Sequence, residues 1–320
     1  MKRPSLPLPT WTEGRERLRL FGFPLIENIR TFSRATHVSE GLLWRLCRST
    51  SDYYRTVIHE VSSDKSRTLH CPDRRLALVQ RWILRRILDR LSPAPYATAY
   101  VPEKNIAHHL SPHLGNLYLL VIDIENFFPS IRFDQVRNVF DVIGFPSSGA
   151  NLLSYICTLD HRLPEGAVTS PSLSNLVFSA LDRRIADQAS VRNVVYTRYC
   201  DDLTFSAEDV RPLLSLRPII QAMLRKSGFT INKHKTRLGR PGGRRVVCGL
   251  AFRGESFGVT RNFKRKVRAM IHNTSLLAPD DESFNRSVRR IRGMASYLHS
   301  VDEVRERQLR KYASELGVQL

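Results

Sequence analysis

The amino-acid sequence predicts an α+β fold of about two compact units. Runs typical of β-strands cluster in the middle of the chain, helical patterns fill both ends, and 320 residues are enough for about two cores. Apolar residues make up 42% of the chain and charged residues 25%, which is ordinary for a globular protein and argues against wholesale disorder.

The N-terminal part of the chain is predicted to be mainly helical. Its first sixty residues favour helices with loops, and residues 73–91 form the clearest helical pattern. One apolar stripe recurs there at helical spacing while arginines cover the other faces; the stripe consists of Leu76, Val79, Ile83 and Ile87. The prolines of segment 92–96 end this helix.

The middle of the chain carries the strand signals. Residues 117–124 are an almost continuous apolar run, which is typical of a strand buried on both faces. A helix is predicted at 173–186. Two β-rich runs follow, at 194–199 and 203–206, and only residues 200–202 separate them, so the spacing predicts a tight hairpin.

The C-terminal part combines short strands with helices. Strands are predicted at 229–232 and 246–252, and the Arg-Pro-Gly-Gly segment at 240–243 forms a turn between them. Beyond about residue 260 the pattern is helical to the end of the chain.

The charge balance is unusual and indicates a polyanionic partner. Fifty Lys and Arg against thirty Asp and Glu leave a net charge of +20, which favours nucleic acid first and an anionic membrane surface second. No apolar stretch approaches the roughly 18 residues that span a bilayer. Segment 225–270 holds fourteen Lys or Arg and one acid, Glu255, interleaved with phenylalanines. This segment is either a solvated basic face or a surface that follows a phosphate backbone.

Several classes of function lack support in the sequence. The five cysteines are scattered without a CxxC pair, which favours a reducing compartment over a disulfide framework or a zinc knuckle. No secretory segment follows Met1, so we expect a cytoplasmic protein. His109 and His113 have the spacing of a helical metal pair, but Pro112 between them disfavours that helix. The motifs of serine hydrolases, P-loop enzymes and dinucleotide-binding proteins are absent.

Three aspartates stand at positions that are expected to be buried or half-buried, where a charged carboxylate is energetically unfavourable. Asp123 ends the apolar run, and Asp201 and Asp202 occupy the tip of the predicted hairpin. If the two strands are neighbours in one sheet, the three carboxylates converge. Such oxygens can hold two divalent ions about 4 Å apart, which stabilise the attacking and leaving oxygens of a phosphoryl transfer. The alternative is that Asp-Asp is ordinary turn chemistry.

Seven short motifs follow one another in the order known from reverse transcriptases. The first reads Val-Ile-Asp-Ile at 121–124 and continues with Phe-Phe-Pro-Ser-Ile, and Tyr-Cys-Asp-Asp at 199–202 is like the YxDD box. The others resemble two fingers motifs, the second palm motif, the motif after the YxDD box and the primer grip; they lie at 65–72, 104–106, 163–176, 228–236 and 247–250. Together with the segments SPSLSNL and RYCDDLTFSA, these motifs make the chain resemble a bacterial retron reverse transcriptase.

The resemblance implies a right-hand polymerase fold of fingers, palm and helical thumb. The N-terminal helices and fingers would span 1–115, and the palm would span 116–250 with a fingers insertion at about 132–165. Residues 251–320 would form the helical, RNA-binding thumb. The implied activity is RNA-directed DNA synthesis from dNTPs with two Mg²⁺ ions, which Mn²⁺ can replace.

The resemblance also implies roles for individual residues. Asp123, Asp201 and Asp202 would be the catalytic metal ligands, with the Ile124 carbonyl near one ion. The residues implied to bind the dNTP are Lys65 and Arg67 at the triphosphate, Phe128 as the steric gate against a ribose 2′-OH, Glu165, and Lys235 near the pyrophosphate. The residues implied to contact primer and template are Tyr199, Cys248 and Gly249.

The partners that the resemblance implies centre on RNA. A retron enzyme binds its cognate noncoding RNA, starts from a guanosine 2′-OH and leaves a branched RNA–DNA product, msDNA. The resemblance further implies a role in anti-phage defence with a separate effector protein. No RNase H-like acidic set follows residue 260, so RNA removal is expected to rely on host RNase H.

The sequence departs from the family pattern at a few positions. Glu165 stands where the family usually has Gln, and a carboxylate there repels a triphosphate unless a neighbouring Arg or Lys pairs with it. We therefore expect Glu165 to be ion-paired and to shape nucleotide selection. Val168 replaces a usual Pro, and Cys200 fills the variable position of the box. The retron elements NAxxH and VTG are altered at 109–113 and 247–249.

Two other functions compete with this interpretation. A basic nucleic-acid-binding scaffold with an inactive palm would explain the charge but has no need for three converging acids. A reverse transcriptase of another bacterial lineage, of the intron or diversity-generating type, would share the palm motifs. Intron enzymes typically carry a downstream maturase or nuclease region, which this sequence lacks.

Overall fold

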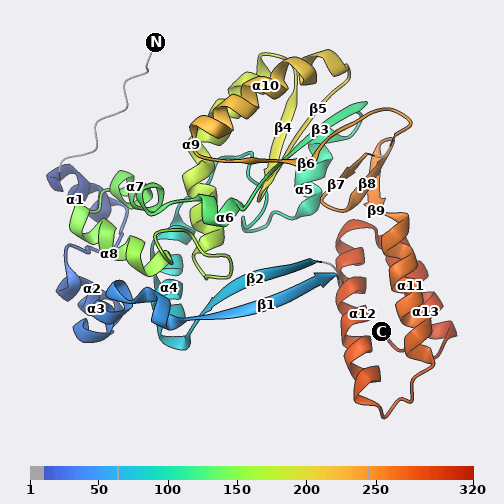
Figure 1. Ribbon diagram of the computed structural model, residues 1–320, viewed down its shortest axis with the longest axis horizontal. Coiled ribbons are helices and arrows are strands. Elements are labelled where there is room, and N and C mark those ends of the chain that lie inside the picture. Colours follow the sequence, from blue (N-terminus) through green and yellow to red (C-terminus); the bar gives the residue numbers. More distant parts are fainter. Residues whose placement is uncertain (1–10, 63–64, 244) are drawn as a thin grey trace. The chain divides into compact units, whose positions relative to one another are not determined.

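The computed structural model describes residues 11–62, 65–243 and 245–320; of these, the side chains of residues 11, 12, 61, 62 and 65 are left out. The chain forms two compact units (Figure 1). The first contains Met1–Pro102, Ile124–Asp187 and Ile219–Asn232, and the second contains Glu103–Asp123, Gln188–Pro218 and Lys233–Leu320. Helices and antiparallel sheets coexist, so the predicted α+β class is confirmed.

The first unit begins with four helices: α1 (Trp11–Leu20), α2 (Ile29–Thr36), α3 (Glu40–Arg48) and α4 (Arg74–Arg86). Asp73 caps α4, because its side chain accepts a hydrogen bond from the Leu76 amide at 2.9 Å. The predicted apolar stripe of this helix is fully buried. The α-helix ends at Arg86, and a 3₁₀ turn (Leu88–Arg90) completes the segment that was predicted as one helix.

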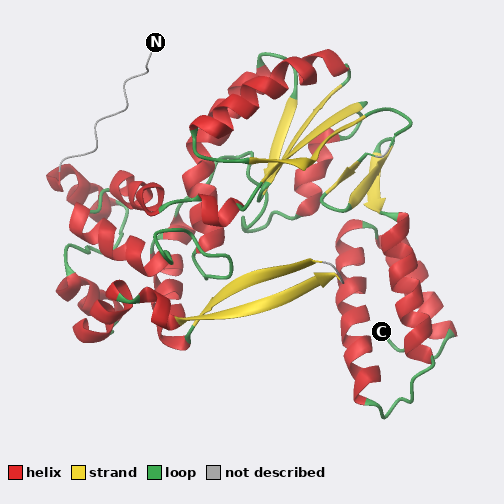
Figure 2. Ribbon diagram, viewed as in Figure 1, coloured by secondary structure: helices red, strands yellow, loops and turns green. Residues whose placement is uncertain are grey.

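A long hairpin follows the first three helices (Figure 2). Strands β1 (Tyr54–Ser62) and β2 (Lys65–Pro72) pair antiparallel from Tyr54 opposite Pro72 onward. The prediction of helices and loops for the first sixty residues is therefore wrong from Tyr54 on. Much of the hairpin is exposed, including 70% of Ile58, so the strands lack the polar–apolar alternation of a half-buried sheet.

The rest of the first unit is helical and packs around aromatic rings. It contains α6 (Phe127–Ser130), α7 (Phe133–Ile143), α8 (Ser147–Cys157) and α9 (Ser170–Ser190), which extends the helix predicted at 173–186. Phe127, Phe178 and Phe229 are buried, with ring centroids 5.0–6.1 Å apart. Contact between Phe127 and the other two rings anchors the turn that follows β3.

The second unit is built on a four-stranded sheet with the order β4-β5-β3-β6. Its strands are β3 (Tyr118–Ile124), β4 (Val195–Tyr199), β5 (Asp202–Ala207) and β6 (Ile231–Gly239). The buried strand at 117–124 and the tight hairpin at 194–206 are confirmed. The strand predicted at 229–232 is longer than expected and runs to Gly239, where residues 240–243 form the predicted turn.

A second sheet corrects the prediction of one strand at 246–252. The segment splits into β7 (Val246–Val247) and β8 (Leu250–Arg253), and β9 (Ser256–Val259) completes the sheet. Cys248 and Gly249 form the turn, both with positive φ, at 47° and 81°. Two such residues between paired strands are typical of a type I′ hairpin, which is why an apolar run of seven residues does not stay one strand.

Three helices complete the second unit: α11 (Arg261–Ser275), α12 (Glu282–Val301) and α13 (Glu303–Glu315). Their buried residues, among them Val267, Ile291 and Leu309, share one core with Val247 and Leu250 of the second sheet. The predicted helical C-terminus is thus confirmed. No helix in the described part of the chain is long and apolar enough to cross a membrane.

Candidate active site

The two acidic strand ends meet in the first sheet of the second unit. Strands β3 and β5 are antiparallel, and Asp123 lies directly opposite Asp202. Asp201 precedes β5 in the hairpin turn, which is made possible by Cys200 at a φ of 58°. Directly opposed residues of an antiparallel pair have Cβ atoms about 5 Å apart, so the register alone brings the two carboxylates together.

Burial makes these carboxylates hard to ionise. The pKa of Asp202 is raised to about 6, first by burial and then by the nearby charge of Asp201. Burial also raises the pKa of Asp123, and the Lys235 ammonium opposes that rise. One oxygen of Asp123, Oδ1, is buried without a hydrogen-bond partner. Buried acids of this kind are stabilised by positive charge placed between them.

Carboxylate oxygens are the ligands that Mg²⁺ prefers, and the orphaned Asp123 oxygen leaves one donor open. No group of three His, Cys, Asp or Glu side chains among the described residues is gathered closely enough to hold an ion without rearrangement. Instead, Lys235 Nζ lies 3.0 Å from Asp123 Oδ2 and supplies the positive charge. A divalent ion bound at this carboxylate would take over the charge compensation that Lys235 now provides.

Strand β6 supplies the cations of the site. Lys233, Lys235 and Arg237 alternate along it, so their side chains project from one face. Arg237 donates two hydrogen bonds to the Val246 carbonyl, at 3.1 and 2.8 Å, and its charge opposes the rise in the pKa of Asp202 that burial and Asp201 cause. Lys235 was predicted from the sequence and Arg237 was not, although the alternation of basic residues along this strand is a signal that the sequence contains.

Cys248 lies beside the carboxylates. Its Sγ donates to Asp202 Oδ2 at 3.2 Å, and burial together with that carboxylate raises the pKa of the thiol. The preceding and following strands β7 and β8 hold this thiol at the tip of their turn, with Gly249 next to it. Tyr199, the other residue predicted to contact primer or template, is paired with Asp202 in the register of β4 and β5.

Two buried histidines support the sheet next to the carboxylates. His113 contacts Ser206 Oγ through Nδ1 and Thr197 Oγ1 through Nε2, both at 2.7 Å. His109 contacts the same Thr197 hydroxyl through Nδ1 at 2.8 Å and Thr204 Oγ1 through Nε2 at 3.1 Å. The histidine pair noticed in the sequence is therefore hydrogen-bonded to strand hydroxyls on β4 and β5.

The directions of these hydrogen bonds follow from counting protons. The Thr197 hydroxyl has one proton, which it donates to the His109 carbonyl at 3.0 Å. It must therefore accept from His109 Nδ1 and from His113 Nε2. Burial lowers the pKa of each ring to about 3, so each ring is neutral at pH 7 and carries one proton. The other nitrogen of each ring then accepts, from Thr204 and from Ser206 respectively.

The residues implied to hold the nucleotide, with the exception of Lys235, lie in the first unit. Arg67 Nη1 on β2 is 3.5 Å from Glu165 Oε1, so the expected ion pair of Glu165 is confirmed. The His70 amide also donates to the Glu165 carbonyl at 2.7 Å. Gly166 has a φ of 113°, and a Cβ there would lie 2.9 Å from the His70 carbonyl oxygen, so only glycine allows this loop to approach the hairpin.

Phe128 and Lys65 are two further residues implied to bind the dNTP. The Phe128 ring on α6 lies 6.2 Å from the Tyr100 ring and is half-buried, which leaves one side of it accessible. Lys65 begins β2, and its side chain lies outside the described residues. Ile124 ends β3 next to Asp123 and is buried.

A neutral residue in place of Glu165 would leave Arg67 without the carboxylate that it now pairs with. We expect Glu165→Gln to lower the KM for dNTPs by about two- to tenfold, because Arg67 then has no carboxylate to neutralise it and attracts the triphosphate more strongly. Steady-state kinetics and misincorporation rates on one template test this. Glu255→Gln, which also removes an exposed carboxylate, is the control. Equal KM and equal fidelity in Glu165→Gln and in the parent protein would show that the ion pair has no part in nucleotide selection.

Comparison with known proteins shows the family to which the chain is similar. Residues 58–308 match the family described as Reverse transcriptase (RNA-dependent DNA polymerase). The chain is 36% identical to the Retron Ec86 reverse transcriptase of Escherichia coli over 94% of this chain and 92% of that protein. It is 33% identical to the Retron Mx65 reverse transcriptase of Myxococcus xanthus, over 80% of this chain and 65% of that protein.

A solved structure of a foamy viral protease-reverse transcriptase with double-stranded DNA matches with a TM-score of 0.44 and 17% identity, over 83% of this chain and 45% of that chain. The family match includes both acidic strand ends and the hairpin between β4 and β5. The fold is that of the right-hand polymerases, and neither an inactive scaffold nor an intron-type lineage describes the chain. It belongs to the retron reverse transcriptases and is an RNA-directed DNA polymerase.

Proposed function

We propose that this enzyme copies a cognate noncoding RNA into branched RNA–DNA, starting from a guanosine 2′-OH and using dNTPs and Mg²⁺. The observation that carries the proposal is the opposed pair Asp123 and Asp202 in a chain that aligns with retron reverse transcriptases over nearly its whole length. The net charge of +20 supports a nucleic-acid partner for the same chain.

The three aspartates would hold the metal ions. Asp123, Asp201 and Asp202 would provide the carboxylate ligands and Ile124 a carbonyl, and Mn²⁺ would serve in place of Mg²⁺. Bound ions would supply Lewis-acid activation of the attacking hydroxyl and charge neutralisation of the departing pyrophosphate. Lys235, now paired with Asp123, would be released toward the pyrophosphate and donate a proton to it.

Other residues would hold the nucleotide and the primer end. Lys65 and Arg67 would grip the triphosphate, and Glu165 would moderate the charge of Arg67. Phe128 would exclude a 2′-OH from the incoming sugar by contact. The residues that would line the primer and template are Tyr199, Cys248 and Gly249, which lie on or beside strand ends of the second unit.

The remaining expectations concern the domains and the cell. Fingers, palm and thumb would occupy 1–115, 116–250 with an insertion at about 132–165, and 251–320. Basic segment 225–270 and the helices after it would hold the RNA stem by phosphate contacts. The enzyme would act in the cytoplasm in anti-phage defence, with a separate effector protein, and host RNase H would remove copied RNA.

Product analysis tests the proposal. The protein is produced together with RNA transcribed from the DNA that flanks its gene, and nucleic acid is extracted before and after treatment with a 2′–5′ debranching enzyme. We expect a short DNA whose mobility changes on debranching, and which is absent for Asp201→Asn/Asp202→Asn. Linear DNA that debranching does not alter would contradict priming from a 2′-OH while leaving polymerase activity intact.

A further inference from the structure

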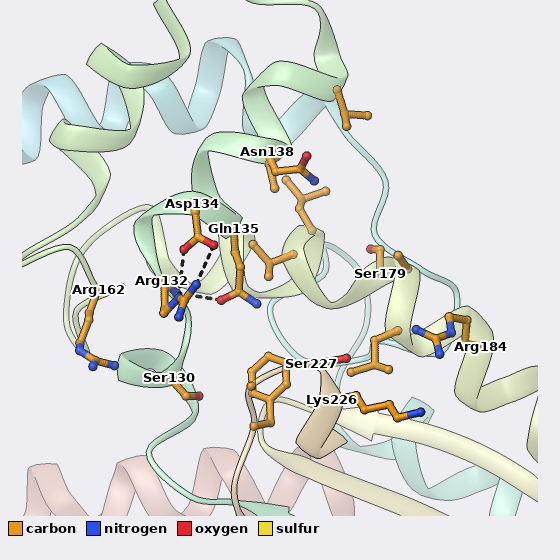
Figure 3. Close-up of a pocket in the computed structure, with 18 of the residues that line it drawn as sticks. Ser130, Arg132, Asp134, Gln135, Asn138, Arg162, Ser179, Arg184, Lys226 and Ser227 are labelled. Atoms are coloured by element: carbon orange, nitrogen blue, oxygen red, sulfur yellow. Dashed lines mark hydrogen bonds and ion pairs between the residues drawn. The ribbon is translucent and has the colours of Figure 1, made fainter. Parts of the chain in front are cut away.

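The first unit contains a large groove whose lining does not include the residues proposed to bind the nucleotide. Its volume is about 1530 Å³, and its walls come from α7, α9 and the end of α10 (Val210–Lys226) (Figure 3). Partly buried aliphatic side chains form part of its lining, among them Val139, Leu176 and Val177. Small-molecule sites usually occupy about 300–1,000 Å³, so this groove is large enough for part of a macromolecule.

Basic side chains stand on both sides of the groove. In Figure 3, Arg132 and Arg162 lie on one side, and Arg184 and Lys226 lie on the other. Arg183, the neighbour of Arg184 on α9, also lines it. Against five basic residues the lining holds two acids, Glu125 and Asp134.

The basic residues of the groove differ in whether a carboxylate already neutralises their positive charge. Arg132 donates two hydrogen bonds to the Asp134 carboxylate, at 3.1 and 3.0 Å, so this pair is close to neutral. For Arg183, Arg184 and Lys226, all exposed, no ion pair or side-chain hydrogen bond occurs within the described residues. The wall formed by α9 and α10 therefore presents three uncompensated positive charges.

The lining does not suit catalysis. Serines are present, at 92, 130, 179 and 227, but the lining contains no histidine or cysteine, so the Ser–His and Cys–His pairs of nucleophilic catalysis are absent from it. Serine hydroxyls and the amides of Gln135 and Asn138 are groups that bind phosphate oxygens and ribose 2′-OH groups by single hydrogen bonds. The groove is therefore suited to holding a chain of phosphates and sugars.

A peptide fits the groove less well. A strand would need an open sheet edge to pair with, whereas these walls are helices. An amphipathic helix would need a continuous apolar stripe, but here Ser179, Arg183 and Arg184 stand among the aliphatic residues that α9 contributes to the lining. Single bases would need aromatic platforms, and the ring of Phe229 is buried, at 4% exposure.

We propose that this groove binds the sugar–phosphate backbone of a base-paired segment of the RNA, outside the region that is being copied. The proposal deepens the function proposed above and rests on it for the identity of the RNA. Backbone recognition requires charge on both walls and polar groups between them, and both are present. The site would anchor the folded RNA while its template strand moves through the polymerase.

Paired charge reversals test the groove. Arg183→Glu/Arg184→Glu changes two adjacent, exposed arginines on α9. Arg85→Glu/Arg86→Glu is the matched control, because these arginines are also adjacent, exposed and helical, on α4 of the same unit, and do not line the groove. The probes are the transcript of the flanking DNA and an unrelated RNA hairpin of equal length, and the Kd is measured over a series of salt concentrations.

We expect the α9 reversal to weaken binding of the flanking transcript at least tenfold and to reduce the slope of log Kd against log salt by about two, since each lost phosphate contact removes just under one counterion. The control reversal changes the Kd less than about twofold. Both proteins keep the maximal rate of extension of oligo(dT) on poly(A), because the three aspartates are unaltered.

Several outcomes overturn the proposal. Equal affinity of the α9 reversal and the parent protein, or equal losses in both reversals, would show that the groove does not bind RNA. The proposed function fails separately: if the parent protein yields no branched DNA from the flanking transcript, that function is wrong. A selective loss of RNA affinity in the α9 reversal would then still assign the groove to RNA.

Discussion

Replacing Asp202 with asparagine is expected to abolish nucleotide incorporation and, at the same time, to stabilise the metal-free protein. Asp202 faces Asp123 across β3 and β5, where it would serve as a metal ligand. A neutral amide there weakens binding of the ions that stabilise the transition state. We expect a loss of at least about a thousandfold in rate, equivalent to about 4 kcal/mol.

The gain in stability follows from the raised pKa of the same group. Burial and Asp201 raise the pKa of Asp202 to about 6 from an ordinary 3.8, so the folded protein binds a proton on this group more readily than the unfolded chain. The charged form of Asp202 therefore lowers the free energy of unfolding. This loss of stability is complete above about pH 6 and absent below pH 3.8. At pH 7.5 the amide should raise the free energy of unfolding by about 2–3 kcal/mol.

Asp209→Asn is the control for both measurements. Asp209 is a partly exposed aspartate of the same unit, and Arg211 Nε lies 2.6 Å from it and lowers its pKa. Its replacement should leave incorporation unchanged and slightly reduce stability, which is the opposite sign. Denaturant unfolding in EDTA and dNTP incorporation on an RNA template measure the two effects. Full activity of Asp202→Asn would exclude it as a metal ligand.

The carboxylate pair was predictable because its signals are local. An apolar run that ends in Asp123, and two β-rich runs separated by three residues, specify the strands and the hairpin within about ten residues each. The pairing of β3 with β5 joins segments about eighty residues apart and was only a condition in the sequence argument. In the sequence, the convergence of these strand ends followed only from the family resemblance. In the structure, the register of β3 and β5 shows it directly.

Other parts depend on contacts that no local pattern specifies. The ion pair of Glu165 was expected, but its partner, Arg67, lies on a hairpin about a hundred residues earlier. The β1–β2 hairpin was missed because exposed strands lack a clear period. The histidines were noticed in the sequence only as a spacing. Their actual partners are hydroxyls on two strands that follow much later in the chain.

Removing one of these histidines should have the second large effect. His113→Ala deletes a ring that bonds Thr197 and Ser206, and it leaves both hydroxyls in a buried space without that partner. An unsatisfied buried group costs about 1–3 kcal/mol, and the cavity adds to this, so we expect the free energy of unfolding to fall by about 3–4 kcal/mol at pH 7.5. His299→Ala, at an exposed position of α12, is the control.

The pH dependence of that loss identifies the cause. Burial lowers the pKa of His113 to about 3 from an ordinary 6.5, so between these values the unfolded chain binds a proton that the folded protein does not. The stability that neutral His113 contributes is therefore complete above pH 6.5 and declines as the pH falls, by about 1.4 kcal/mol per pH unit. The contribution of Asp202 to the pH dependence of stability has the opposite sign, but it is present in both proteins, so it cancels in the comparison.

The difference in the free energy of unfolding between the parent protein and His113→Ala should accordingly shrink from pH 6.5 toward pH 4.5. Equal differences at both pH values would show that His113 takes up a proton as readily in the folded protein as in the unfolded chain, and would contradict a neutral ring that accepts from Ser206.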